Sequence, residues 1–253
     1  MSTTKFCQGI SDLSDSYAAF ILDQYGVLHN GEKPFDGVVE CLTELKNRRK
    51  IVILLSNSSK RAAENRARLT KIGIPEDLYD DMVTSSELVW QGLHDHSGVF
   101  KGLGSKCYLI SHGNDRSVVA GLPDVTVVDS PSDADFLLIV GCDAPQKSLD
   151  DYDPLLKEAA KNRLKAICSN PEMRGLVGGQ PVLGTGAVAR RYQDLGGVVT
   201  YIGKPFEPIY AACANFLRKK DIFPGQCVVI GDAMDQDILG GVTAEMDTCL
   251  IAA

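Results

Sequence analysis

The stretch AAFILDQYG, residues 18–26, decides the fold class, because an apolar run ends there in a carboxylate and a glycine. Five apolar residues in succession are typical of a strand that is buried on both faces of a sheet. The same arrangement, an apolar run followed by polar residues, recurs along the chain, and amphipathic stretches separate the runs. This alternation predicts an α/β fold with a Rossmann-like, doubly wound parallel sheet that helices cover on both faces.

Two Gly-rich zones interrupt the alternation. Residues 96–105 are typical of a linker, and residues 175–186 are typical of a loop rather than of a regular element. Together they indicate a middle segment inserted into a sheet that both ends of the chain form. Strands are expected at 18–22, 51–56, 106–110, 125–128, 136–140, 166–168, 199–202, 228–230 and 248–251. Helices are expected at 38–48, 61–71, 86–93, 154–161, 187–195 and 208–219.

The composition narrows the class of partner. The 253 residues carry a net charge of -7, and 44% of them are hydrophobic and 23% charged, which is ordinary for a globular protein. Nucleic-acid binding needs clustered Lys and Arg, and no basic stripe is present in the sequence. A small anion remains possible as a ligand, since that requires only local donors.

The apolar runs are far too short to span a bilayer, and residues 1–17 lack the basic start and apolar stretch of a signal peptide. Several of the eight cysteines lie inside apolar runs, among them Cys107 and Cys168, and no C-x-x-C pair occurs. This pattern favours reduced core thiols over disulfides and disfavours a structural zinc site. We therefore expect a cytoplasmic protein without a membrane partner.

Polar residues that could form a site follow several of the expected strands. In parallel sheets the ligand lies beyond the carboxyl ends of the strands, so these side chains are expected to meet at one edge. A carboxylate is a reasonable nucleophile toward phosphorus, and two neighbouring carboxylates require a hard cation such as Mg²⁺ between them. Hydroxyl and lysine side chains suit the phosphate oxygens. The residues are Asp23, Ser56, Asn57, Ser58, Lys204, Asp232 and Asp237.

Four motifs together resemble those of the haloacid dehalogenase (HAD) superfamily, in the same order and at strand ends. They are DQYGVLHNG at 23–31, LLSNSS at 54–59, GKPFEP at 203–208 and GDAMDQD at 231–237. The S-N-S-S form of the second motif, the G-K-P sequence and the long middle insertion are similar to the class IIA, NagD-like branch.

The resemblance implies a hydrolase with a HAD core domain, residues 1–84 and 196–253, and an inserted α/β cap domain, residues 85–195. Members of that branch are mostly Mg²⁺-dependent phosphatases of small phosphorylated metabolites, and related caps often form dimers, so a homodimer is possible. The implied catalytic residues are Asp23, Ser56 and Lys204. The implied metal ligands are Asp23, the carbonyl of Tyr25, Asp232 and Asp237. The implied substrate-binding residues are Asn57, Ser58, Asn170, Glu172 and Gly186.

Tyr25 departs from the phosphatase pattern, which has an aspartate at this position as general acid and base. A tyrosine with a pKa near 10 is a poor base at neutral pH. Two alternatives therefore stay open. Haloacid dehalogenases also resemble D-x-Y-G, which suggests carbon–halogen hydrolysis with the same nucleophile. Alternatively, the protein is a catalytically weakened module that binds a phosphorylated metabolite.

Several residues also have a purely structural interpretation. Ser56 and Asn57 could cap the following helix, and Tyr25 could be a packing aromatic. Asp237 could ligate a metal through water or hold its own loop. Glu172 could be a solvated loop charge.

Overall fold

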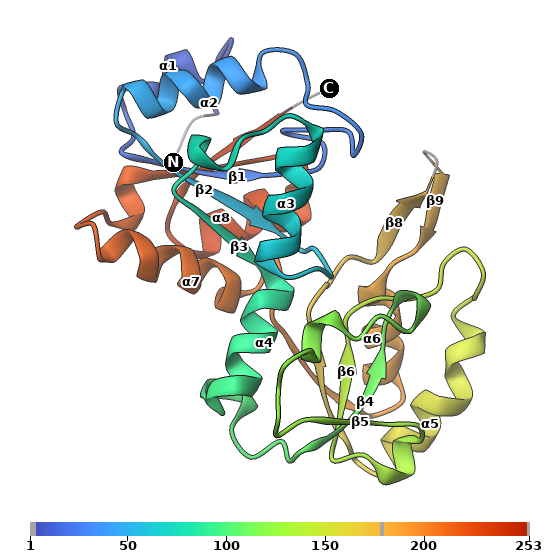
Figure 1. The fold of residues 1–253 in the computed structure, drawn as a ribbon. Helices are drawn as coiled ribbons and strands as arrows, with labels where there is room; N and C mark the ends of the chain where they lie inside the picture. The colour runs from blue at the N-terminus through green and yellow to red at the C-terminus, as the bar shows by residue number, and fades with distance from the viewer. Residues whose placement is uncertain (1–3, 178–179, 252–253) are drawn as a thin grey trace. The chain divides into compact units, whose positions relative to one another are not determined.

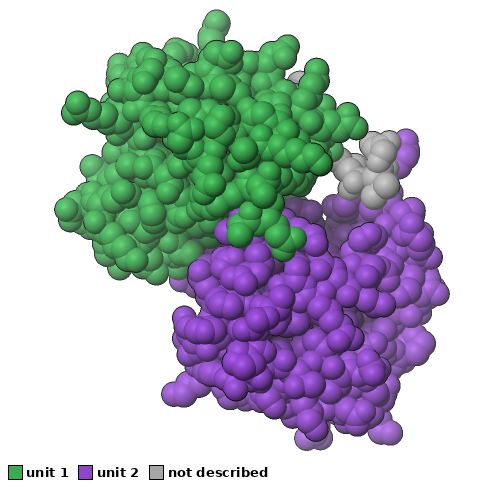
Figure 2. Space-filling model, viewed as in Figure 1, with its two compact units in different colours: residues 1–56, 63–83, 210–253 green, residues 57–62, 84–209 purple. Residues whose placement is uncertain are grey.

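The computed structural model describes residues 4–177 and 180–251, which form two compact units (Figure 2). Unit 1 comprises residues 1–56, 63–83 and 210–253, and unit 2 comprises residues 57–62 and 84–209. Each unit has its own five-stranded sheet. Within the described residues, no helix combines the length and apolar character needed to cross a bilayer.

Unit 1 contains a sheet in the order β12-β11-β1-β2-β3, and the pairs of β1 with β2 and with β11 are parallel. Counted along the chain within this sheet, the order is 3-2-1-4-5, the Rossmann arrangement. In Figure 1, α2 and α7 lie on opposite sides of this sheet. The strands are β1 (Ala19–Asp23), β2 (Ile51–Ser56), β3 (Asp81–Thr84), β11 (Cys227–Gly231) and β12 (Asp247–Leu250). The helices are α1 (Ser11–Ser14), α2 (Val38–Asn47), α3 (Ala62–Ile72), α7 (Glu207–Arg218), a π-helical turn (Met234–Ile238) and α8 (Leu239–Thr243).

Unit 2 contains a second sheet in the order β10-β7-β6-β4-β5, and its strand pairs are parallel. Counted along the chain, this order is 2-1-3-4-5, the flavodoxin-like arrangement. The strands are β4 (Lys106–Ile110), β5 (Thr126–Val128), β6 (Phe136–Ile139), β7 (Lys165–Cys168) and β10 (Val198–Tyr201). The helices are α4 (Ser85–Asp95), α5 (Asp153–Lys161) and α6 (Thr185–Asp194), and β8 (Arg174–Val177) pairs with β9 (Gln180–Leu183). Short 3-10 turns in unit 2 lie at Gly98–Phe100, His112–Asn114, Ser117–Val119, Pro131–Asp133 and Asp150–Tyr152, and those in unit 1 lie at Glu76–Leu78 and Pro224–Gln226.

The central strands are apolar throughout because both of their faces are covered. In β6, Leu138 contributes to one buried cluster, whereas Leu137 and Ile139 contribute to the other. Successive side chains of a strand point to opposite faces, so one short run supplies two cores. All eight cysteines are free, as predicted, and Cys107, Cys168, Cys213 and Cys227 are buried.

The structure confirms the α/β class and every strand expected from the sequence, and it corrects two interpretations. The Gly-rich zone 175–186 is not only loop, because β8 and β9 form an antiparallel hairpin within it; residues 178–179 lie outside the described part. Strand β10 was expected in the sheet that carries Asp23, but it pairs with β7 in the second sheet. An apolar run does not encode its partner, and β10 is apolar enough for either sheet.

The cap limits at residues 85 and 195 stay a prediction, since a compact unit is not in itself a cap.

Candidate active site

Three carboxylates meet at the carboxyl ends of β1 and β11, within unit 1. Asp23 ends β1, Asp232 directly follows β11, and Asp237 lies in the π-helical turn after it. One oxygen from each side chain lies within 4.8 Å of the other two. Strand order reverses between β1 and β11, which makes this edge the topological switch point where ligands of such sheets bind.

This set of donors fits a single hard cation. Carboxylate oxygens are the ligands that Mg²⁺ and Ca²⁺ prefer. Six oxygens about 2.1 Å from Mg²⁺ lie roughly 3 to 4 Å from one another, so a small adjustment brings the three carboxylates into range. Without a cation, three anions this close would repel one another. The predicted ligands Asp23, Asp232 and Asp237 are therefore brought together by the fold.

Two glycines make room for these carboxylates. Gly26 has a φ of 85°, and a Cβ there would overlap the Asp232 carboxylate. A Cβ at Gly231 would overlap the Asp237 side chain, which is 1% exposed. The Asp237 carboxylate also accepts a hydrogen bond from the Ala233 N–H at 3.2 Å. Asp237 thus holds its own turn, whether or not it also ligates a metal.

The loop after Asp23 is organised by a buried histidine. His29 Nδ1 accepts a hydrogen bond from the Gly31 N–H at 3.0 Å, and the Gly26 N–H donates to the His29 carbonyl at 3.0 Å. Burial and the nearby Arg68 lower the pKa of His29 to about 4, so the ring is neutral at pH 7. Tyr25 packs edge-on against this ring, with centroids 6.1 Å apart, and its side chain is 53% exposed. Tyr25 is therefore partly a packing residue and partly open to solvent.

Ser56 ends β2, the strand beside β1, and β1 and β2 pair in register from Ala19 with Ile51 to Asp23 with Leu55. The two strands therefore present Asp23 and Ser56 at the same edge of the sheet in unit 1. This matches the expectation that polar residues after neighbouring strands converge.

Asn57 and Lys204 lie together in unit 2, 4% and 2% exposed respectively. The Lys204 N–H donates to Asn57 Oδ1 at 2.7 Å, and Asn57 Nδ2 donates to the Lys204 carbonyl at 3.2 Å. Ser58 forms a turn, because its hydroxyl accepts a hydrogen bond from the Lys60 N–H at 3.1 Å. The Asn57 amide is thus occupied by protein backbone.

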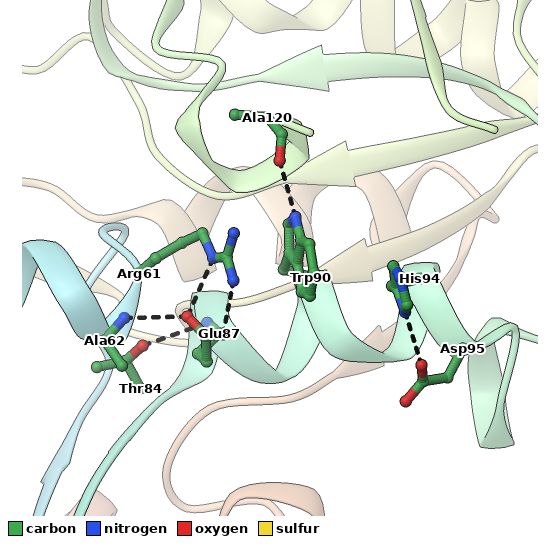
Figure 3. A network of polar contacts seen from close by, with 8 residues as sticks. All are labelled: Arg61, Ala62, Thr84, Glu87, Trp90, His94, Asp95 and Ala120. Carbon is green, nitrogen blue, oxygen red and sulfur yellow. Dashed lines mark hydrogen bonds and ion pairs between the residues drawn. The ribbon is translucent and has the colours of Figure 1, made fainter. Parts of the chain in front are cut away.

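Segment 57–62 is fastened to helix α4 of unit 2 (Figure 3). Arg61 donates from Nε and Nη2 to the two carboxylate oxygens of Glu87, at 3.0 and 2.7 Å, and the Ala62 N–H donates to the same carboxylate at 3.1 Å. The Arg61 guanidinium also lies over the Trp90 ring, 3.8 Å from its centroid. Bidentate pairs of this kind impose a defined geometry, so this segment is held in place by side chains that the motif does not include.

Of the remaining predicted residues in unit 2, Asn170 and Glu172 lie in the loop between β7 and β8, and Gly186 lies in the first turn of α6. Asn170 Oδ1 accepts a hydrogen bond from the Glu172 N–H at 3.0 Å, and the Gly186 N–H donates to the Glu172 carbonyl at 2.8 Å. A Cβ at Gly186 would overlap the carbonyl of Pro171. Gly186 therefore allows the first turn of α6 to pack closely against the loop that carries Pro171.

Sequence reasoning missed the residues that support the site. Gly26 and Gly231 stand beside the carboxylates and could have been found, because a glycine next to a strand-end acid is a signal for close approach. Arg61 and Glu87 could not, because their pairing depends on tertiary structure. Of the predicted residues, unit 1 holds Asp23, Tyr25, Ser56, Asp232 and Asp237, and unit 2 holds Asn57, Ser58, Asn170, Glu172, Gly186 and Lys204.

Two family models match the chain. One, described as haloacid dehalogenase-like hydrolase, matches residues 20–122, and another, described as HAD-hydrolase-like, matches residues 201–253. The first match contains Asp23 and the second contains Asp232. The chain belongs to the haloacid dehalogenase-like hydrolases. The family resemblance drawn from the four motifs is confirmed.

Two relatives match most of this chain. It is 26% identical to an acid sugar phosphatase from Staphylococcus saprophyticus, over 92% of this chain and 85% of that protein. It is 24% identical to a putative NipSnap protein from Caenorhabditis elegans, over 91% of this chain but only 47% of that protein, so the chain spans about half of that relative.

Solved structures share the fold. A haloacid dehalogenase-like hydrolase from Brucella suis superposes with a TM-score of 0.87 at 27% identity, covering 98% of this chain and 94% of that one. NagD from Escherichia coli K-12 superposes with a TM-score of 0.67 at 23% identity, covering 93% and 88%. The similarity to NagD predicted from the motifs is thereby confirmed at the level of the fold.

Proposed function

We propose that this hydrolase is a Mg²⁺-dependent phosphatase of a small phosphorylated metabolite and acts through a covalent aspartyl-phosphate. The observation that supports this most directly is the cluster of Asp23, Asp232 and Asp237 at the switch point of unit 1. Three carboxylates in such proximity are favourable only with a shared cation, and a phosphoryl group is a natural further ligand of that cation.

The proposed chemistry divides into two displacements at phosphorus. In the first, a carboxylate oxygen of Asp23 forms a bond to phosphorus, the bond to the leaving oxygen breaks, and the leaving oxygen takes up a proton. In the second, water attacks the aspartyl-phosphate, gives up a proton, and releases inorganic phosphate and the free carboxylate. The Ser56 hydroxyl would donate to a phosphoryl oxygen, and the Lys204 ammonium would compensate its charge.

Mg²⁺ is the proposed cofactor, with Asp23, Asp232, Asp237 and the Tyr25 carbonyl as the residues that would hold it. When bound, it supplies positive charge that offsets the repulsion between the nucleophile and the phosphate. The protein's own contribution is to keep the carboxylates close together, which Gly26 and Gly231 permit.

Tyr25 sets the expected rate. A general acid and base contributes roughly 10²- to 10⁴-fold, and a neutral tyrosine is a poor substitute for aspartate in that role. We therefore expect slow turnover, with aryl phosphates cleaved better than alkyl phosphates, because an alkoxide leaving group depends more on protonation.

The substrate is proposed to be a small phosphorylated metabolite. Residues 85–195 would act as a cap over it, with Asn57, Ser58, Asn170, Glu172 and Gly186 as the substrate-binding residues. The acid sugar phosphatase among the relatives makes sugar phosphates the first compounds to test. Assembly as a homodimer and a cytoplasmic location stay predictions from the sequence.

A panel of phosphate esters tests the proposal. Sugar phosphates, a short alkyl phosphate and p-nitrophenyl phosphate are incubated with the protein, with and without Mg²⁺, and phosphate release is measured. Mg²⁺-dependent release that disappears in Asp23→Asn supports the proposal. Release that is independent of Mg²⁺, or that persists in the variant, contradicts it.

Carbon–halogen hydrolysis is the second candidate, and Tyr25 is the observation that favours it. Tyr25 follows the nucleophile by two residues in the D-x-Y-G sequence that resembles haloacid dehalogenases, and its side chain is half exposed. Halide release from a 2-haloacid, together with no release of phosphate from any ester, would establish this candidate in place of the first.

A further inference from the structure

Asn57 and Lys204 form a reciprocal pair that uses both ends of the asparagine amide. Oδ1 accepts from the Lys204 N–H at 2.7 Å, and Nδ2 donates to the carbonyl of the same residue at 3.2 Å. The two residues are 147 positions apart in the chain and almost completely buried. Loss of a hydrogen bond in such surroundings costs free energy, because the buried backbone groups cannot bond to water instead.

The glycine before Lys204 is part of the same arrangement. A Cβ at Gly203 would overlap Asn57 Oδ1 and the Ser169 carbonyl, and it would lie 2.8 Å from Cδ of Pro171. The turn that carries Lys204 is therefore wedged between the Asn57 amide on one side and the end of β7 on the other. Only a residue without a side chain allows this approach.

We infer that Asn57 is a positioning residue that acts through Lys204 by fixing its backbone, rather than a residue whose side chain contacts the substrate. This inference rests on the proposed phosphatase function and replaces the substrate-binding role proposed there for Asn57. A lysine side chain has four rotatable bonds, so the location of its ammonium depends strongly on where its backbone is held. The asparagine amide carries its acceptor and its donor on two separate atoms, so it can pair with both the N–H and the C=O of one residue at once.

The inference differs from a substrate-contacting role in how the effects of two substitutions combine. If Asn57 acts through Lys204, its removal has little effect once the Lys204 side chain is gone. A direct contact from Asn57 predicts instead that its removal still lowers kcat in that background. Gly203→Ala should also lower kcat, because the added methyl displaces the Asn57 amide; this variant tests whether the position of that amide matters to turnover.

The experiment measures Mg²⁺-dependent hydrolysis of p-nitrophenyl phosphate by Asn57→Ala, Lys204→Ala, the double variant and Gly203→Ala. Asn162→Ala is the control for loss of an asparagine in unit 2, where its amide contacts the Pro131 carbonyl. Gly225→Ala is the control for an added methyl, since a Cβ there meets nothing within 4 Å. Hydrogen exchange at the Lys204 amide reports whether the hydrogen bonds between Asn57 and the Lys204 backbone are intact. Melting temperatures report whether each variant is folded.

We expect Asn57→Ala and Gly203→Ala each to lower kcat by about 10- to 100-fold, in line with a displacement of roughly 1 Å. In the Lys204→Ala background, Asn57→Ala should lower kcat by less than about threefold, although the Lys204 amide still exchanges faster. Both controls should match the parent.

Three outcomes would overturn the inference. The first is a loss of kcat in the double variant that equals the product of the losses in Asn57→Ala and Lys204→Ala. The second is a folded Gly203→Ala protein with parental kcat, and the third is unchanged exchange at Lys204 in Asn57→Ala. If the parent hydrolyses no phosphate ester, the proposed function fails, and the role of Asn57 in turnover fails with it. Faster exchange of the Lys204 amide in Asn57→Ala would then still show that Asn57 holds the Lys204 backbone.

Discussion

The two parallel sheets each have a topological switch point, and the two points differ in the residues that they bring together. In unit 1 the point lies between β1 and β11, and three carboxylates meet there. In unit 2 it lies between β4 and β6, where the Asp143 carboxylate accepts a hydrogen bond from the Gly113 N–H at 2.8 Å. A Cβ at Gly141 would lie 2.8 Å from the His112 backbone nitrogen, so the two loops are in close contact.

The difference shows what a strand-end glycine does and does not indicate. Gly26 in unit 1 admits a carboxylate that belongs to a cluster of like charges. Gly141 in unit 2 admits backbone, and the nearby Asp143 is paired with Lys147 at 2.9 Å. Strand order alone therefore predicts a candidate site at the switch point of each sheet. The concentration of like charge, which a ligand must offset, is what distinguishes the edge in unit 1.

The largest expected effect is the loss of turnover in Asp23→Asn. An amide is a far weaker nucleophile toward phosphorus than a carboxylate, so kcat should fall by at least ~10³-fold. Phosphate release from p-nitrophenyl phosphate measures this, and Asp36→Asn is the control for an exposed aspartate further along the same loop region. Activity of Asp23→Asn within tenfold of the parent would mean that another residue is the nucleophile.

The next effect concerns the cation. Asp232→Asn removes one charge from the cluster and should weaken Mg²⁺ binding at least tenfold, because carboxylate charge is the main attraction for a hard cation. Titration calorimetry measures the affinity directly. Asp235→Asn, in the neighbouring turn but outside the cluster, should leave it unchanged. Equal affinities in parent and Asp232→Asn would remove the metal site from the proposed function.

Much of the unit 1 site could be predicted from the sequence, because its residues stand next to the elements that place them. Asp23 and Asp232 directly follow apolar runs, and parallel strands in a doubly wound sheet bring their carboxyl ends to one edge. The strand expected at 199–202 was also correct, but its sheet was not, because pairing of β10 with β7 is a long-range choice that local pattern does not encode.

The unit 2 residues were harder to interpret for the same reason. The pair of Asn57 and Lys204 joins positions 147 residues apart, and nothing in either motif indicates which backbone the amide will meet. The hairpin of β8 and β9 was hidden by glycines, which weaken strand propensity, although two neighbouring segments can satisfy each other's backbone groups. In such cases tertiary context overrides local preference.

Tyr25→Asp is expected to raise activity. If the only deficit of the parent is proton transfer, an aspartate at this half-exposed position should increase kcat on p-nitrophenyl phosphate toward ~10²-fold, the low end of general acid–base effects. Activity is scaled to folded protein, because the Tyr25 ring packs against His29 and its loss could lower stability. Tyr25→Phe is the control for the hydroxyl alone. A folded Tyr25→Asp protein without any gain, beside a parent that already cleaves alkyl phosphates efficiently, would show that another residue supplies the proton.

The smallest effect is expected at the second switch point, where Asp143→Asn should leave turnover within twofold of the parent. The hydrogen bond from the Gly113 backbone, followed by that from Lys147, lowers the pKa of Asp143 in the folded protein. A carboxyl with a lowered folded pKa stabilises the fold above its unfolded value of about 3.9 and loses that contribution as the pH falls through the folded value.

Thermal melts at pH 7 should therefore show Asp143→Asn to be less stable by about 1 kcal/mol, since a charge-assisted hydrogen bond contributes ~1.5–3 kcal/mol and the side chain is 24% exposed. The difference should shrink at pH 3, whereas the exposed Asp133→Asn should match the parent at both pH values. A tenfold loss of turnover in Asp143→Asn would instead show that the second switch point takes part in the reaction. Residues at the ends of both sheets would then contribute to turnover.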